Sequence, residues 1–295
     1  MARFVYVNGQ YRRYHEAGVH VEDRGFQFGD AVYEVIEVAG GGLVDAERHL
    51  ARLERSLNEL QIEAPMSRQA LLHVIAETVR RNRVREGLVY MQVSRGAAKR
   101  DFLFSGKSLV PTLVCLARPL SRALRDASAD KGISVISLPD IRWGRCDIKT
   151  VMLLPAALAK EEALKAGASE AWLVDRQGFV TEGASSNAWI VNALGELQTR
   201  SLSNDLLPGV TRRTLFDVAQ FLGLQVKEAA FTIEDAKNSR EAFNTSASGI
   251  VMPVVKIDGI NVSDGRPGTL SRKLREVFHD HAVLYPLGHG FHQPK

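Results

Sequence analysis

The sequence predicts an α+β protein with two domains, and three observations lead to this fold class. At 295 residues the chain is too long for one small domain and suits one large or two medium domains. Runs of alternating apolar and polar residues, typical of strands, are interspersed with runs in which apolar residues recur at helical spacing. No βαβ series with a GxGxxG turn or a Walker loop is present, which argues against a doubly wound nucleotide-binding domain.

Residues 1–120 are predicted to form an N-terminal α+β domain. It begins with a hairpin, because Asn8-Gly9 tolerates the positive φ of a two-residue turn between two strand-like runs. The periodicity then predicts, in chain order, a strand over 32–38, a helix bearing the leucines at 50, 53, 57 and 60, a helix over 68–81, and strands over 88–94 and 112–117.

Residues 121–132 are polar and charged without a strong apolar period, so we expect an interdomain linker there. Residues 133–285 are predicted to form the second domain, and the Gly-, His- and Pro-rich residues 286–295 a frayed tail. The elements expected in the second domain are strands over 133–138, on both sides of the turn 175–178, and over 187–192, 224–228, 242–245 and 251–257, with helices over 153–166, 211–222 and 270–284.

Composition excludes several classes of protein. A hydrophobic fraction of 45% with 24% charged residues is ordinary for a globular chain and rules out a disordered one. The two cysteines, Cys115 and Cys146, exclude a disulfide framework and a four-thiolate zinc site, and they suit a reducing compartment. We find no signal peptide and no apolar run long enough to span a bilayer, so we expect a cytoplasmic protein without a membrane partner.

Lys149 is the first candidate for chemistry. It ends the run 140–149 between a predicted strand and a predicted helix, and apolar residues flank it on both sides. Apolar surroundings favour the neutral, nucleophilic form of an amine. The alternative, and the commoner fate of an arbitrary lysine, is a side chain that snorkels to solvent at a helix start.

Glu182 is the second candidate. A strand brings this lone carboxylate to a loop of small residues, where it can pair with a buried cation while Ser185 and Ser186 bond a ligand. An ordinary polar β-turn is the alternative and, taken alone, the more common outcome.

Three places suit an anion. Val210 and Thr211 begin a predicted helix with free N–H groups, residues 245–249 form a hydroxyl-rich turn, and Arg52 can clamp a phosphate. The alternatives are helix starts that bind only water and a surface ion pair for Arg52. His279 and His281 lack carboxylate or thiol neighbours at ligand spacing, so no metal site is expected.

A lysine, a carboxylate and several phosphate donors together suggest pyridoxal phosphate. The amino-acid types in residues 22–35, 140–149 and 181–187, and the order in which they occur, indicate the family more specifically. The chain closely resembles the fold-type-IV pyridoxal-phosphate enzymes and, within them, the D-amino-acid aminotransferases, from about Phe4 to Leu284. This resemblance implies a small N-terminal α/β domain and a larger C-terminal domain built on a mixed β-sheet or barrel.

The resemblance also implies roles for single residues. Lys149 would bind pyridoxal 5′-phosphate covalently, Glu182 would accept a hydrogen bond from the protonated pyridine nitrogen, and Leu207 would lie against the ring. The implied phosphate ligands are Arg52, Val210, Thr211, Ser246 and Ala247. The implied substrate pocket contains Tyr33, Val35 and Arg100, and in the family the loop bearing this arginine crosses a homodimer interface.

The expected reaction is ping-pong transfer of an amino group from a D-amino acid such as D-alanine to a 2-oxo acid, either 2-oxoglutarate or pyruvate. Two departures from the family pattern are notable. Phe102 stands where the D-amino-acid enzymes usually have a histidine, so we expect weak carboxylate binding and some activity on (R)-amines. Ala184 replaces the first of three serines, which removes one hydrogen bond.

Three alternatives remain open at this point. A branched-chain aminotransferase and an aminodeoxychorismate lyase share the fold and the cofactor. The Tyr33-x-Val35 pair with Arg100 favours the D-specific pocket over the first, and the spelling of residues 142–149 favours it over the second. A basic nucleic-acid-binding protein is the remaining alternative, since the net charge is +4, but the basic residues are dispersed and only 7% of residues are aromatic.

Overall fold

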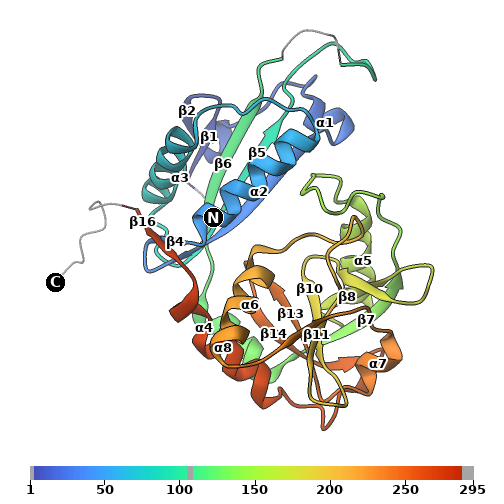
Figure 1. Ribbon diagram of the computed structural model, residues 1–295. Coiled ribbons are helices and arrows are strands. Elements are labelled where there is room, and N and C mark those ends of the chain that lie inside the picture. The colour runs from blue at the N-terminus through green and yellow to red at the C-terminus, as the bar shows by residue number, and fades with distance from the viewer. Residues whose placement is uncertain (1–2, 105–108, 288–295) are drawn as a thin grey trace, which may run out of the picture. The chain divides into compact units, whose positions relative to one another are not determined.

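The computed structural model describes residues 3–104 and 109–287, which fall into two compact units (Figure 1). The N-terminal unit comprises Met1–Arg122, Ile148–Met152 and Val283–Lys295, and the C-terminal unit comprises Ala123–Asp147 and Leu153–Ala282. The chain therefore returns to the N-terminal unit twice after first leaving it.

The N-terminal unit is built on a seven-stranded antiparallel sheet in the order β16-β4-β3-β5-β6-β1-β2. Its strands are β1 (Phe4–Val7), β2 (Gln10–Arg13), β3 (Ala31–Ala39), β4 (Gly42–Val44), β5 (Gly87–Ser94), β6 (Thr112–Pro119) and β16 (Leu284–Pro286). Its helices are the 3₁₀ turn Tyr14–Glu16, α1 (Arg24–Phe28), α2 (Ala46–Glu59) and α3 (Arg68–Asn82). The expected hairpin between β1 and β2 is confirmed, with φ angles of 43° at Asn8 and 91° at Gly9.

Helices α2 and α3 cover the same face of this sheet. Glu34 of β3 pairs with Met91 of β5, which pairs with Cys115 of β6, so these three side chains share one face. Glu34 bonds to His49 of α2, and the Cys115 thiol is hydrogen-bonded to Thr78 of α3. The other face of β3 carries the alternate residues, and these include the expected substrate residues.

The C-terminal unit contains a nine-stranded mixed sheet in the order β12-β11-β10-β13-β14-β7-β8-β9, with β15 paired to β14. The strands are β7 (Ile133–Pro139), β8 (Glu170–Val174), β9 (Val180–Gly183), β10 (Asn187–Val191), β11 (Leu197–Thr199), β12 (Val226–Glu228), β13 (Glu241–Ser246), β14 (Ile250–Ile257) and β15 (Ile260–Asn261). The helices are α4 (Arg122–Lys131), α5 (Leu154–Lys165), α6 (Val210–Phe221), α7 (Ile233–Lys237) and α8 (Thr269–His281).

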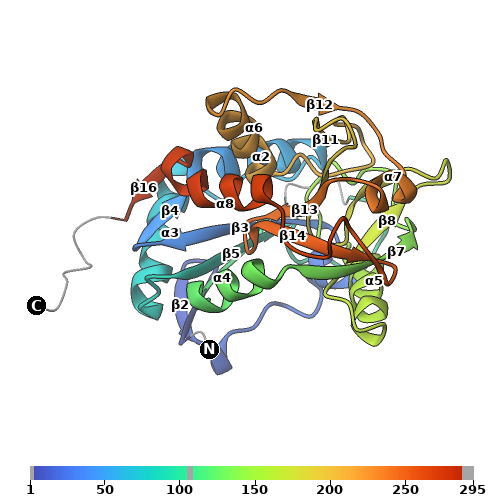
Figure 2. The ribbon, with the colours of Figure 1, turned by 90° about the horizontal axis from the view of Figure 1, so that it is seen from below.

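Strands β7 and β8 are parallel neighbours, so the chain must cross over between them, and α5 lies in that crossover. The core of the unit is aromatic, with Trp172, Trp189, Phe231 and Phe243 buried. In Figure 2, α8 and α4 lie beside β14, and Arg275 of α8 binds Asp126 of α4 at 2.7 Å.

The strongly periodic elements lie where the sequence predicts them, and the differences have physical reasons. The segment expected to be the linker 121–132 is instead the helix α4, which buries only Arg125 and Ala129 and so lacks an apolar stripe. The last helix ends at His281 rather than near 284, because the chain there becomes β16 and pairs with β4. Residues 288–295 of the expected tail lie outside the described part of the chain.

The expected second domain, 133–285, also differs from the compact unit in one respect that matters for function. Residues Ile148–Met152 belong to the N-terminal unit, because their backbone bonds to β3. Lys149 therefore belongs to the N-terminal unit rather than to the second domain, in which the sequence places it.

Candidate functional site

The backbone of Lys149 is fixed against the edge of β3. Its carbonyl oxygen accepts a hydrogen bond from the N–H of Tyr33 at 3.0 Å, and its own N–H donates to Ser56 Oγ of α2 at 3.3 Å. The next residue, Thr150, forms an isolated β-bridge with Val32. These contacts join segments about a hundred residues apart in sequence and fix the point from which the lysine side chain starts.

Lys149 is half-buried, and its amine lies 4.2 Å from the centre of the Tyr33 ring. An ammonium at this distance is attracted to the ring face. Across residues 3–104 and 109–287, the structure gives Nζ no hydrogen bond and no ion pair. The side chain is thus held beside an aromatic ring while its nitrogen remains available to react.

Glu34 is a fully buried carboxylate on the helix-covered face of β3. His49 Nδ1 lies 2.8 Å from its Oε2, while Arg52 donates through Nε to Oε1 and through Nη2 to Oε2, each at 2.8 Å. Burial alone would raise the pKa of Glu34, but the charge and hydrogen bonds of Arg52, with the hydrogen bond from His49, lower it to about 2. Burial lowers the pKa of His49. Arg52 is therefore fixed in a buried ion pair rather than the surface pair considered from sequence.

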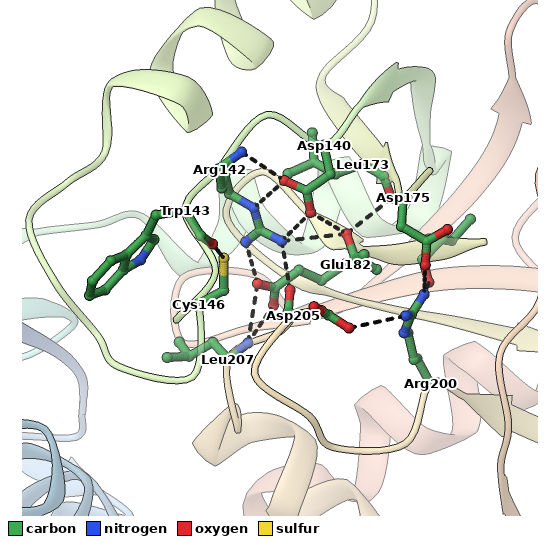
Figure 3. Close-up of polar contacts among 12 residues, drawn as sticks. Asp140, Arg142, Trp143, Cys146, Leu173, Asp175, Glu182, Arg200, Asp205 and Leu207 are labelled. Atoms are coloured by element: carbon green, nitrogen blue, oxygen red, sulfur yellow. Dashed lines mark hydrogen bonds and ion pairs between the residues drawn. The ribbon is translucent and has the colours of Figure 1, made fainter. Parts of the chain in front are cut away.

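Glu182, in β9 of the C-terminal unit, lies at the centre of a network of donors (Figure 3). Arg142 Nη1 donates to its Oε1, and Asn187 Nδ2 donates to its Oε2 at 3.0 Å. The N–H of Leu207 lies 3.1 and 3.2 Å from the two oxygens. The carboxylate is buried and held in one orientation.

Arg142 connects Glu182 to a second carboxylate, Asp140 (Figure 3). It donates through Nε to Asp140 Oδ1 at 2.9 Å and through Nη2 to Oδ2 at 2.7 Å. Burial opposes the charged form of Arg142, but the hydrogen bonds of Asp140 and the charges of Glu182 and Asp140 outweigh it and raise the pKa of the guanidinium. Arg142 is therefore a permanent cation between two acids.

A second arginine fixes the loop that precedes α6. Arg200 binds Asp175 at 2.6 Å and the side chain of Asp205 at 3.2 Å, while Arg142 Nη2 donates to the carbonyl oxygen of Asp205 at 3.0 Å (Figure 3). The loop continues directly to Leu207, whose N–H binds Glu182. Two arginines thus determine where this backbone donor lies.

The expected phosphate ligands of this unit lie at two neighbouring backbone turns. Gly209 caps α6 without any side-chain bond, so the N–H groups of Val210 and Thr211 belong to the unsatisfied first turn of the helix. Asn187 connects the two turns, because it pairs with Thr245 in the sheet and its Oδ1 would overlap a Cβ on Gly209. No side chain larger than hydrogen fits at this cap.

The other turn follows β13. Ser246 Oγ accepts from the N–H of Gly249 at 3.0 Å and lies 3.3 Å from Ser248 Oγ, which closes a compact turn around Ala247. A turn of this kind directs backbone N–H groups toward an anion.

The hydroxyls of Ser185 and Ser186 both contact a buried carboxylate that sequence reasoning did not single out. Ser185 Oγ donates to Glu170 Oε2 at 2.7 Å and Ser186 Oγ lies 3.4 Å from it. Because these hydroxyl protons point to Glu170, the lone pairs of the oxygens are left for other donors.

The expected substrate residues of the N-terminal unit lie in two places. Tyr33 and Val35 share the face of β3 opposite Glu34, both half-buried. The guanidinium of Arg100 lies 5.4 Å from the Phe28 ring and 5.9 Å from the Phe102 ring. Phe102 is 80% exposed and packs edge-on against Phe28.

Sequence reasoning assigned no role to several residues of these networks, among them Glu34, Asp140, Arg142 and Glu170. A signal for Glu34 was available, since it is in phase with the apolar residues Val32 and Ile36 of its strand and so had to be buried. Arg142 lies in the run 140–149, but its partner Glu182 is 40 residues away in sequence. Nothing in the local pattern predicts such a pairing.

Two negative findings apply to residues 3–104 and 109–287. No group of three or more His, Cys, Asp or Glu side chains is arranged to hold a metal ion. None of the helices there is long and apolar enough to cross a membrane.

Comparisons with known proteins give aminotransferases over most of the chain, both by sequence and by structure. Residues 31–257 match the family model of the amino-transferase class IV proteins. A D-alanine aminotransferase of Staphylococcus haemolyticus is 38% identical over 93% of this chain and 96% of the relative, and one of Bacillus licheniformis is 36% identical over 92% and 94%. Among solved structures, the T.th. branched-chain amino acid aminotransferase with pyridoxamine 5′-phosphate has a TM-score of 0.86 at 27% identity, covering 95% of this chain and 94% of the other.

Proposed function

The chain belongs to the class IV aminotransferases, and we propose on that premise that it transfers the amino group of a D-amino acid, D-alanine first among them, to a 2-oxo acid. The observation that carries this proposal is the likeness to D-alanine aminotransferases over more than nine-tenths of the chain. The branched-chain enzyme of known structure is more distant in sequence, although it has the same fold.

The side chains present fit pyridoxal 5′-phosphate, the cofactor of this family. Lys149 has an amine without a polar partner in the described residues, which suits covalent attachment to an aldehyde. Glu182 is a buried carboxylate, which suits a protonated ring nitrogen. The start of α6, which has no side-chain cap, the turn around Ala247, and the residues Arg52 and Ser246 would hold the phosphate.

When bound, pyridoxal phosphate supplies an electron sink for the charge that develops at the substrate Cα and carries the amino group between the two half-reactions. With the cofactor bound, Lys149 would be the base that takes up the proton of the substrate Cα and returns it. Glu182 would favour a proton on the ring nitrogen, and the phosphate ligands would fix the position of the cofactor.

Binding of the substrate carboxylate is assigned to Tyr33 and Arg100, with Val35 beside them. In support, Tyr33 lies against the Lys149 amine, and Arg100 stands on an exposed loop among phenyl rings. We further propose a homodimer in which this loop reaches the partner's site, because Phe102 and Leu103 are 80% and 75% exposed. The cytoplasm is the proposed compartment, since Cys115 and Cys146 are both free thiols.

The proposal is tested by incubating the holoenzyme with 2-oxoglutarate and, in separate reactions, D-alanine, L-alanine and L-leucine. Glutamate and the matching 2-oxo acid are then quantified. D-alanine should be converted at least tenfold faster than either L-amino acid. Faster conversion of L-leucine would replace the proposal by a branched-chain specificity, and no glutamate from any donor would reject transamination.

A further inference from the structure

Asp140 is the third member of the ion pair between Arg142 and Glu182. It makes more contacts with the arginine than Glu182 does. Arg142 gives two nitrogens, Nε and Nη2, to the two oxygens of Asp140, and a single nitrogen, Nη1, to Glu182. The guanidinium is therefore bound in bidentate fashion to Asp140, the stronger arrangement of such pairs. One cation lies between two carboxylates, so the three side chains together carry one net negative charge.

All three groups are shielded from solvent. The side chains of Glu182, Arg142 and Asp140 are 5%, 12% and 11% exposed, so their charges are screened far less than those of surface groups. Although burial raises the pKa of Asp140, the hydrogen bonds and charge of Arg142, with a hydrogen bond from Thr181, lower it in net. Asp140 is consequently ionised at neutral pH.

The charge of Asp140 decides what Glu182 can do. Without Asp140, the full positive charge of Arg142 would be balanced by Glu182 alone, and a neutral ion pair stabilises a further proton poorly. With Asp140 present, its carboxylate offsets the guanidinium and Glu182 retains the excess negative charge. Asp140 also holds Arg142, which in turn fixes the orientation of Glu182.

We propose that Asp140 is a positioning residue for the reaction: acting through Arg142, it keeps Glu182 orientated and negatively charged so that Glu182 holds a proton on the ring nitrogen of the cofactor. The inference rests on the proposed function, because pyridoxal phosphate supplies that nitrogen. In the described residues, the side chain of Asp140 contacts Arg142 and Thr181, and its backbone N–H donates to the carbonyl oxygen of Val174.

The test uses holoenzyme reconstituted with pyridoxal phosphate labelled with ¹⁵N in the ring, because the ¹⁵N chemical shift reports protonation of that nitrogen without turnover. Three variants are compared with the wild type. Asp140→Asn keeps the shape and removes the charge, whereas Asp140→Glu keeps the charge and changes the shape. Asp175→Asn is the matched control, since Asp175 also pairs with a partly buried arginine, Arg200, that binds the same loop at Asp205.

We expect Asp140→Asn to lower the pKa of the ring nitrogen by about one unit, with Asp140→Glu and Asp175→Asn close to the wild type. An unchanged nitrogen titration in Asp140→Asn would overturn the inference. So would an equal change in Asp140→Glu or in Asp175→Asn, because either would show a response to loop geometry rather than to charge.

If Asp140→Asn does not retain the cofactor, Asp140→Glu decides the matter: a protonated nitrogen supports the inference and a deprotonated one overturns it. The wild type separates this inference from the proposed function. A wild-type protein that binds no pyridoxal phosphate would reject the function itself, whereas a wild type with a protonated ring nitrogen and an unresponsive Asp140→Asn rejects only the role of Asp140.

Discussion

Arg52 binds Glu34 through two nitrogens, Nε and Nη2, each 2.8 Å from a different carboxylate oxygen, beneath a helix that covers β3. The pair orientates an arginine that we assign to the phosphate of the cofactor. It also places a buried charge in the core of the N-terminal unit, and such a charge is costly if it loses its partner.

Glu34→Gln should therefore destabilise the protein by about 3–5 kcal/mol, because a buried guanidinium would lose its counter-charge. Urea unfolding followed by circular dichroism measures the change. The matched control is Glu54→Gln on the same helix as Arg52, where the exposed bidentate pair with Arg68 should be worth less than about 1 kcal/mol. Equal effects of the two substitutions would contradict the buried role of Glu34.

Stability should fall in acid in two stages. The pKa of His49 is lowered by burial, so the unfolded chain binds a proton more readily and stability decreases as the pH falls below 6.5. The pKa of Glu34 is lowered to about 2, so its contribution, on the order of 3 kcal/mol, is present above pH 4.5 and is lost as the pH falls from there toward 2. Unfolding midpoints measured between pH 7 and pH 3 should show a shallower loss below pH 4.5 in Glu34→Gln than in the wild type. Parallel curves would refute this assignment.

Glu182→Gln should retain pyridoxal phosphate, because the phosphate ligands are unchanged, yet slow the removal of the substrate Cα proton by about two orders of magnitude or more. The amide cannot hold the ring-nitrogen proton by charge, and its NH₂ group would face a donor, either Arg142 Nη1 or Asn187 Nδ2. Single-turnover kinetics with D-alanine provide the measurement. An unchanged rate would remove Glu182 from the mechanism.

Gly209→Ala should weaken cofactor binding at least tenfold and lower stability by about 1–3 kcal/mol. A Cβ at this position would overlap Asn187 Oδ1 and would push Asn187 away from Glu182 and Leu207. Gly144→Ala is the control, since a Cβ there meets nothing within 4 Å. Titration of the apoenzyme with pyridoxal phosphate compares the two, and equal affinities would contradict the close approach at Gly209.

Arg100→Ala should raise the KM for D-alanine at least tenfold and leave the reaction with an (R)-amine that lacks a carboxylate nearly unchanged, because a charged hydrogen bond to the carboxylate is lost. Steady-state kinetics on both substrates test this. Unchanged D-alanine kinetics would place the carboxylate site elsewhere.

Phe102→His is the complementary change. Phe102 is exposed, so the substitution should leave the fold intact while adding a donor near Arg100. We expect a lower KM for D-alanine and D-glutamate and less activity on the (R)-amine. A higher KM for D-alanine would contradict the proposed pocket.

The sequence predicts the long elements, such as β3, α2 and α3, because each is long enough to repeat its hydrophobic pattern several times. The short elements β4, α1 and α7 were not predicted, because three to five residues give too few repeats of a pattern to identify it. The motifs around Lys149 and Glu182 were found because the residues of each motif are neighbours in the sequence. The residues that hold Lys149 and Glu182 in place were not found, because Ser56, Arg142 and Asn187 come close to them only in the folded protein.

The attachment of Lys149 to the N-terminal unit illustrates the same limit. Its residue type and apolar neighbours are visible in the sequence, but the hydrogen bonds to Tyr33 and Ser56 span more than ninety residues. Because these bonds come from the backbone, Lys149→Ala should fold normally. It should lose covalent cofactor binding and at least a thousandfold in transamination rate, with circular dichroism as the check on folding.

The most direct test of the whole account is to reduce the wild-type holoenzyme with borohydride, digest it and locate the pyridoxyl group by mass spectrometry. We predict a single label on Lys149. A label on Lys160 or Lys165 instead, with Lys149 unmodified, would contradict the account, because both of those lysines belong to α5 of the C-terminal unit and neither contacts Tyr33 in the described structure.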